Sequence, residues 1–320
     1  MGLSDGGGDG GIRMRNDYKR TDNPRFLKPN THTMSTKISA ALKQLLSINA
    51  HPPSLNHSPA FHHQLKGLLA DLNRTAVEKR LSTDSWTIFS TAALVSLNRP
   101  SAFEPFWKSL VATSKERELV YQARLVRETA LKSISFIGIA KAINALNAFR
   151  EVIEGSEGEI VARLDEEQAR RVPAEAGENT VPKVFARASE TWKSIYRPLD
   201  EKLRAKLAAA HPDLPVHILH SHYGPLLSDP PTNRGPIGRI GTSLIAIGTL
   251  RAAQHLGPQL LSHVYGLRKA AEELPSRPEP SLGAGTDWLT SDDGAQWIIS
   301  AIDRLSTLVS NCEHHPSPKL

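Results

Sequence analysis

We predict an all-α fold for this chain of 320 residues. Apolar residues recur every three or four positions over several long segments, which is the spacing that buries one face of a helix. β-branched residues occur, but not in the alternating runs, bounded by turn residues, that are typical of strands. Prolines, glycines and helix-capping residues fall between the periodic segments, where helices are expected to begin and end.

The first half of the chain reads as consecutive helices. In the earliest segment, Ile38, Leu42, Leu45 and Leu46 share one face, which we expect to be buried. Either Thr83 or Asp84 can cap a later helix, because both side chains accept hydrogen bonds from free N–H groups of a first turn. The predicted helices of this half cover 35–48, 60–81, 85–97, 102–112, 115–137 and 138–154.

Gly138 interrupts the apolar pattern, and a new helix begins there. Ile139, Ile143, Leu146 and Phe149 lie on one face of it, and three alanines allow close approach by another helix backbone. We therefore expect a tight antiparallel helix pair. Two asparagines inside this segment, at positions 144 and 147, either find buried partners or lie at the edge in contact with water.

The second half reads as a more divergent set of helices, broken at Pro198, Pro212 and Pro215. The small-residue segment 239–250 corresponds weakly to 86–97, which suggests an internal repeat. Ser291 is the expected N-cap of the last helix. The expected organisation is a disordered tail over 1–33, a helical unit over 34–154, a linker with a short exposed helix over 155–181, a second helical unit over 182–311 and a polar tail over 312–320.

Composition excludes several classes of function. The net charge is +6, but basic residues are interleaved with acidic ones, so we expect no nucleic-acid partner. The longest uncharged apolar run, 240–250, is far shorter than the roughly 20 residues of a membrane span. Cys312 is the single cysteine, which excludes a dithiol redox pair and favours a reducing compartment. We expect a cytoplasmic protein, with the mitochondrion as the alternative.

Two stretches carry a resemblance to a known family. The segment "STDSWTIFSTAALVSLNR" is followed by "LVRETALKSISFIGIAKAINALNAFREVI", and "GRIGTSLIAIGTLRAAQHLGPQLLSHVYGLRKA" follows in the second half. These segments resemble the carboxymuconolactone decarboxylase and alkylhydroperoxidase-D (AhpD)-like superfamily, in a fungal-type branch with two units and no CxxC motif. The resemblance covers about three quarters of the chain, and it implies two AhpD-like helical units in tandem, packed face to face.

The resemblance also implies what chemistry to expect. Counting back from His263, Leu256 and Gln259 stand where the peroxidase branch has its two cysteines. Since thiol chemistry needs a thiolate, a thiol peroxidase is excluded unless Cys312 reacts alone. The decarboxylase branch needs no cofactor, because a general acid or base moves protons while a cationic residue holds a carboxylate.

We therefore take four residues as candidates for the site. His263 is the expected acid or base, and Arg239 is the expected carboxylate-binding residue. Glu128 matches the family's glutamate position and could orient a basic group, and Tyr223 is a candidate proton donor. The first three have a simpler alternative: a hydrogen-bonded core histidine, a surface arginine at a helix start, and a glutamate paired along its own helix with Arg124 or Lys132.

The sequence leaves two functions open. The first is a cofactor-free, non-redox lyase, a decarboxylase or dehydratase, acting on a small carboxylated or aromatic substrate, or a relative that has lost this activity. The second is a catalytically inactive helical scaffold for a protein partner, and a homo-oligomer is compatible with both. Four histidines between 211 and 222 lack the further ligands that a metal site needs, so we expect no bound metal.

Overall fold

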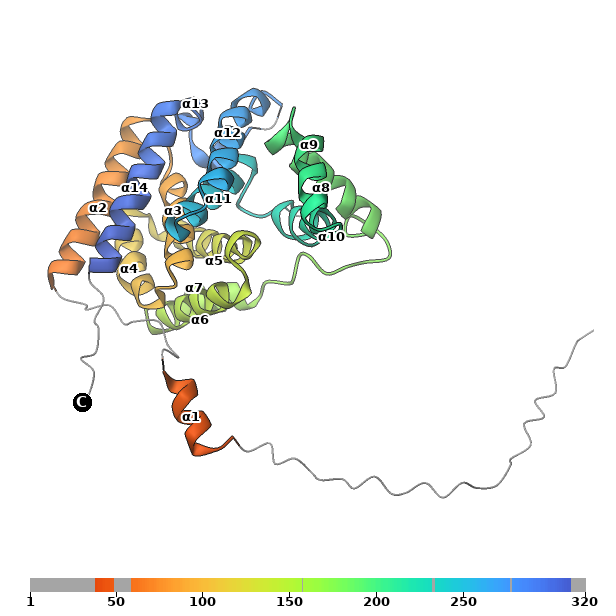
Figure 1. Cartoon of the computed structure of the whole chain (residues 1–320). Coiled ribbons are helices and arrows are strands. Elements are labelled where there is room, and N and C mark those ends of the chain that lie inside the picture. Colours follow the sequence, from red (N-terminus) through yellow and green to blue (C-terminus); the bar gives the residue numbers. More distant parts are fainter. Residues whose placement is uncertain (1–37, 49–58, 157, 232–233, 277, 312–320) are drawn as a thin grey trace, which may run out of the picture. The chain divides into compact units, whose positions relative to one another are not determined.

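The computed structural model describes residues 38–48, 59–156, 158–231, 234–276 and 278–311, and over these ranges the fold is all-α, as predicted (Figure 1). The described residues form no strand, and a single isolated bridge joins Leu81 to Gly283. None of the described helices is both long and apolar enough to cross a membrane. The chain separates into two compact units, residues 1–50 and 51–320. The predicted tails, 1–33 and 312–320, lie outside the described residues.

The first unit contributes one described helix, α1 (Ala40–Ser47). The Ser39 hydroxyl caps it by accepting a hydrogen bond from the Leu42 N–H at 3.2 Å. The apolar face expected here is exposed rather than buried: Leu42, Leu45 and Leu46 have relative exposures of 46%, 65% and 58%. The prediction of a buried face is therefore wrong for the described residues of this unit, because none of them packs against it.

The second unit contains the other described helices. They are joined by short 3₁₀ turns and by one π-helix, Ile218–Leu227. The α-helices are α2 (Pro59–Glu78), α3 (Thr83–Leu97), α4 (Phe103–Thr113), α5 (Leu119–Ile137), α6 (Ile139–Ser156), α7 (Gly158–Asp165), α8 (Val181–Tyr196), α9 (Asp200–Ala210), α10 (Asp213–His217), α11 (Arg239–Ala253), α12 (Gly257–Glu273), α13 (Thr286–Leu289) and α14 (Asp292–Asn311).

Helices α3 and α11 lie at the centre of this unit and make its most extensive helix pairing (Figure 1). Small residues permit their close approach. A Cβ atom added at Gly248 would lie 2.7 Å from the Phe89 carbonyl oxygen and 2.9 Å from the Ala92 Cβ. Helices α5, α12 and α14 pack around the pair. These two central helices are the segments that the weak repeat relates to each other.

One hydrophobic core runs from Phe61 to Val309 and draws residues from both predicted helical units. A smaller cluster is formed by Ala188, Trp192, Ile195, Leu219, Tyr223 and Leu227. The predicted linker contributes to the packing as well. Within it, α7 buries Ile160 and Leu164 against neighbouring helices, so the short helix expected to be exposed is packed on one face. The boundary between tandem units therefore stays a prediction.

Helix α6 packs through its small residues. Ala142, Ala145 and Phe149 are buried, whereas Ile139 and Ile143, which were expected on the buried face, have relative exposures of 62% and 50%. Of the three alanines expected to allow close approach, Ala142 and Ala145 are buried and Ala140 is exposed, so the covered face is the one that carries Ala142, Ala145 and Phe149. Of the two asparagines, Asn144 donates a hydrogen bond to the Asn98 side chain at 3.0 Å, and Asn147 is exposed.

The predicted helix caps have mixed outcomes. Gly138 ends α5 with φ of +82°, a conformation that glycine tolerates. Ser291 accepts a hydrogen bond from the Gly294 N–H at 3.2 Å, which confirms it as a cap. Asp84 does not cap α3. Instead, it is buried and accepts hydrogen bonds from the Tyr121 hydroxyl at 2.6 Å and the Gln122 amide at 2.8 Å, because α5 brings these donors to it.

Candidate functional site

A cavity of about 390 Å³ lies between α8, the loop after the π-helix and the start of α11. We call it the arginine cavity, because three arginines from three segments line it: Arg187, Arg234 and Arg239. Asp229 and Glu279 also line it. Its size is within the range of small-molecule sites in proteins.

None of these three arginines pairs with a carboxylate among the described residues. Arg239 donates to the Ser194 hydroxyl at 2.6 Å, the Ser243 hydroxyl at 2.6 Å, the Gly266 carbonyl at 2.8 Å and the Ser194 carbonyl at 3.2 Å. All four acceptors are neutral, and one of the five N–H groups of a guanidinium is left over. Burial lowers the pKa of Arg239, but an arginine stays charged at neutral pH.

Arg187 and Arg234 are also without an ionic partner in the described structure. Arg187 donates to the Glu178 carbonyl at 2.5 Å and to the Asn179 side-chain oxygen at 3.4 Å, and its Nε is buried without a hydrogen bond. Arg234 is exposed, and no described residue bonds to its side chain.

Three carboxylates line the cavity, Glu190, Asp229 and Glu279, and the last two are engaged with backbone N–H groups. Glu279 accepts hydrogen bonds from the backbone N–H groups of Ile240 at 2.5 Å and Gly241 at 3.3 Å, so it covers the N-terminus of α11. Burial raises the pKa of Glu279. Asp229 accepts from the backbone N–H of Gly235 at 3.0 Å and faces a second group of cations. Glu190 also has a partner, and none of the three carboxylates forms an ion pair with an arginine of the cavity among the described residues.

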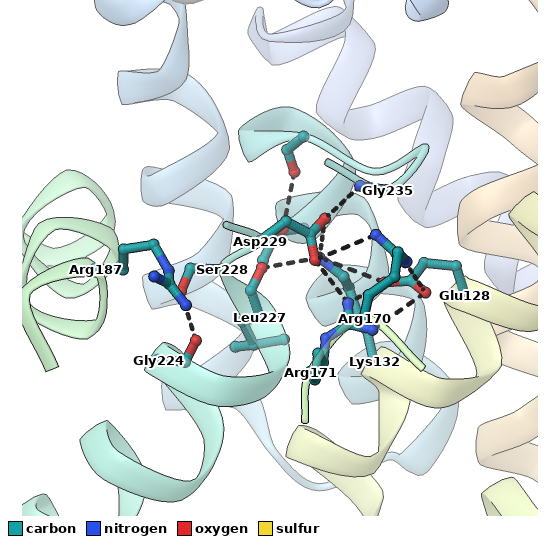
Figure 2. Close-up of polar contacts among 12 residues, drawn as sticks. Glu128, Lys132, Arg170, Arg171, Arg187, Gly224, Leu227, Ser228, Asp229 and Gly235 are labelled. Carbon is teal, nitrogen blue, oxygen red and sulfur yellow. Dashed lines mark hydrogen bonds and ion pairs between the residues drawn. The ribbon is translucent and has the colours of Figure 1, made fainter. Parts of the chain in front are cut away.

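That second group is a buried ion cluster made of Glu128, Lys132, Arg170, Arg171 and Asp229, which Figure 2 shows in close-up. Lys132 Nζ lies 3.4 Å from Asp229 and 3.8 Å from Glu128, and it donates to the Leu227 carbonyl at 2.9 Å. Arg170 pairs with Glu128 at 2.7 Å, and Arg171 bridges Glu128 and Asp229.

Burial dominates the electrostatics of this cluster. The Lys132 side chain is completely buried, and the loss of solvation lowers its pKa despite the two carboxylates beside it. Both carboxylates are also almost fully buried, with side-chain exposures of 7% for Glu128 and 6% for Asp229. Since each buried charge is costly unless paired, the cluster holds α5, the segment around 170 and the loop at 229 in a fixed arrangement.

A third polar group lies beside Arg239. The Tyr196 hydroxyl is 2.7 Å from the Tyr223 hydroxyl and 3.2 Å from His263 Nε2, and His263 Nδ1 is buried without a hydrogen bond. Burial and the nearby charge of Arg239 lower the pKa of His263 to about 3. Burial also raises the pKa of Tyr196 to about 12 and that of Tyr223 well above its ordinary value. These three groups are therefore neutral at physiological pH.

The structure brings three of the four predicted site residues into one region. Tyr223 and His263 both bond to Tyr196, and the charge of Arg239 acts on all three. Arg239 lines the arginine cavity, but His263 does not. Glu128 lies in the ion cluster instead, where Lys132 is its partner along the helix and two further arginines reach it.

Sequence reasoning missed several residues of the site. Lys132 could have been found from the sequence, since it stands four positions after Glu128, where a helix places an ion-pair partner. Arg170 and Arg171 form a basic pair inside the predicted linker. Nothing in the local sequence marks Arg187, Tyr196 or Asp229, because their roles depend on contacts with distant segments.

Of the histidines around the π-helix, only His217 and His222 meet, edge to face with ring centroids 5.3 Å apart, among the described residues. His220 stacks on Phe185 with ring centroids 3.6 Å apart, while His222 lies 3.3 Å from the Ser135 hydroxyl and His217 lies 3.1 Å from the Ser221 hydroxyl. Over the described ranges, no three His, Cys, Asp or Glu side chains come close enough together to hold a metal ion.

Comparison with known proteins adds no relative to this picture. No protein-family model, no curated protein and no solved structure matches this chain.

Proposed function

We propose that this protein is a non-redox, cofactor-free helical protein that binds a small carboxylated molecule in the arginine cavity. One observation carries the proposal: Arg187, Arg234 and Arg239 line one cavity, and none of them pairs with a carboxylate among the described residues. The AhpD-like relationship and its two tandem units remain part of the proposal, on the strength of the sequence motifs alone.

The binding mode follows from the free donors. Arg239 has one N–H left over, and the buried Nε of Arg187 has no acceptor. A ligand carboxylate has two oxygens and about four lone pairs, so it can accept from both arginines at once. Each hydrogen bond to a charged group contributes about 1.5–3 kcal/mol, which is sufficient for selective binding of a small anion.

Turnover by a lyase mechanism would need a group that exchanges protons near pH 7. His263 was the expected group, but burial keeps it neutral, with a pKa of about 3, and Tyr196 separates it from Tyr223. A general base works best when its pKa is near the operating pH. The geometry therefore supports binding better than the lyase step, which stays a prediction for His263 and Tyr223.

Isothermal titration with benzoate and with succinate tests the proposal. We expect binding to the full chain, and we expect Arg187→Gln to weaken it at least tenfold, because one charged donor is lost. Arg163→Gln is the matched control: Arg163 is exposed on α7 and does not line the arginine cavity, and the charge removed is the same. Thermal unfolding of each variant checks that the fold is retained.

Two results would count against the proposal. One is the absence of binding by either carboxylate, which is what the helical-scaffold alternative predicts; that alternative fits the exposed Ile139 and Ile143 on α6. The other is equal weakening by Arg187→Gln and Arg163→Gln, which would mean that only the overall positive charge attracts the anion. Arg234→Gln gives a second reading, since its exposed side chain has no structural partner among the described residues.

A further inference from the structure

We propose a second anion site, for a multiply charged anion of the phosphate class, in a separate cavity of about 740 Å³. We call it the strap cavity, because the irregular segment 167–171 forms one wall of it, opposite α5. The loop 234–236 completes the lining. This site is distinct from the proposed carboxylate site, although Arg234 and Gly235 line both cavities.

The charges that line the strap cavity are unbalanced. Its lining includes two carboxylates, Glu128 and Glu167, against five arginines: Arg124, Arg127, Arg170, Arg171 and Arg234. Lys132 and Asp229, which lie behind the lining in the ion cluster, offset each other and leave the excess of three positive charges unchanged. An anion with two or three negative charges matches this excess, whereas a single carboxylate does not.

The two carboxylates do not satisfy the arginines around them. Glu167 pairs with Arg124, but its other oxygen lies 3.6 Å from Arg127 Nη1, which is beyond hydrogen-bonding distance. That Nη1 is buried and makes no hydrogen bond, and the same is true of Arg171 Nε. A buried donor without an acceptor costs about 1–3 kcal/mol, so both guanidiniums keep hydrogen-bonding capacity that the described residues do not use.

The chemistry of the free donors favours a phosphate group. They come from opposite walls, Arg127 from α5 and Arg171 from the strap, so the ligand needs acceptor oxygens that point in several directions. A tetrahedral phosphate offers three such oxygens, and a planar carboxylate offers two in one plane. Leu131 and Leu146 add an apolar part to the wall, against which an organic group attached to the phosphate can pack.

Gly235 shapes the wall that the two cavities have in common. A Cβ atom at this position would lie 2.6 Å from Arg170 Nη1 and 2.7 Å from Arg170 Nη2. The guanidinium of Arg170 therefore lies directly against the Gly235 backbone, while it also pairs with Glu128 (Figure 2). The cation is held at the edge of the strap cavity by a contact that only glycine allows without a shift of the guanidinium.

Isothermal titration of the full chain with pyrophosphate tests this site, with ionic strength held constant because salt screens exposed charges. We expect pyrophosphate to bind and Arg127→Gln to weaken the binding at least tenfold. The control Arg163→Gln removes the same charge from an exposed position and should leave the affinity unchanged. Arg127 makes a long ion pair with Glu167 and interacts electrostatically with Asp165, and neither carboxylate belongs to the ion cluster, so its substitution leaves the cluster intact.

Three outcomes would overturn the inference: no binding of pyrophosphate, the same affinity in Arg127→Gln as in the natural protein, or equal weakening by Arg163→Gln. The two proposals fail separately. Arg187→Gln should weaken benzoate and spare pyrophosphate, and Arg127→Gln should do the reverse. If Arg187→Gln weakened both ligands equally, the two anions would share one site and the second site would be refuted.

Discussion

Lowering the pH from 7 to 5 should destabilise this protein through His263. The imidazole is almost fully buried, with 4% exposure, and its Nδ1 has no hydrogen-bond partner. Burial and the charge of Arg239 both disfavour the imidazolium, so the folded protein keeps His263 neutral. The unfolded chain has no such restriction, and it gains a proton at this residue as the pH falls.

The magnitude follows from the two pKa values. The ordinary pKa of 6.5 applies to the unfolded chain and the value of about 3 to the folded protein. Because the folded pKa is the lower one, stability is fully present above pH 6.5 and is lost as the pH falls toward 3. At pH 5, about 1.5 pH units below the unfolded pKa, the loss is about 2 kcal/mol, since each unit is worth about 1.4 kcal/mol.

Urea unfolding at pH 7, 6 and 5 measures this effect as a difference between proteins. The natural protein should lose about 2 kcal/mol more than His263→Gln over this range, because glutamine cannot take up the proton. Contributions from other groups, such as Glu279 and Asp84 with their raised pKa values, cancel in the comparison. Replacing the exposed His63 by glutamine is the control. An equal loss in the natural protein and in His263→Gln would refute the reasoning.

Further variants test other parts of the structure by urea or thermal unfolding. Lys132→Met should lower the free energy of unfolding by about 3 kcal/mol, because two buried carboxylates lose a cation. The control Lys108→Met, at 68% side-chain exposure, should change it by less than about 0.5 kcal/mol. Similar effects of the two substitutions would contradict the ion cluster. Gly248→Ala should cost about 1–3 kcal/mol through overcrowding between α3 and α11, and a stabilising effect would contradict their close approach. Tyr196→Phe should lower the free energy of unfolding by about 1–3 kcal/mol, since Tyr223 and His263 would lose their common hydrogen-bond partner. An unchanged stability would mean that these hydrogen bonds are not formed.

The local sequence was sufficient to predict the helices and several of their ends. The three-to-four periodicity predicted α2, α3, α5 and α6, and the break at Gly138 was visible because only glycine readily adopts its positive φ. The same information was not sufficient for packing. On α6 it grouped Ile139 and Ile143 on the inner face, whereas Ala142 and Ala145 are the residues that are buried. Periodicity identifies which residues share a face, but the neighbouring helices decide which face is covered.

The same distinction between local sequence and tertiary contacts applies to the candidate site. The sequence by itself determined an all-α protein without a dithiol pair, and it singled out Arg239 as a cation for a carboxylate. Only the tertiary structure decided that Asp229, 97 positions away in the chain, faces Lys132, and that Arg187 shares a cavity with Arg239. The physical reason is that helix formation depends on neighbours within one turn, whereas burial and charge pairing depend on segments that meet only when the chain folds.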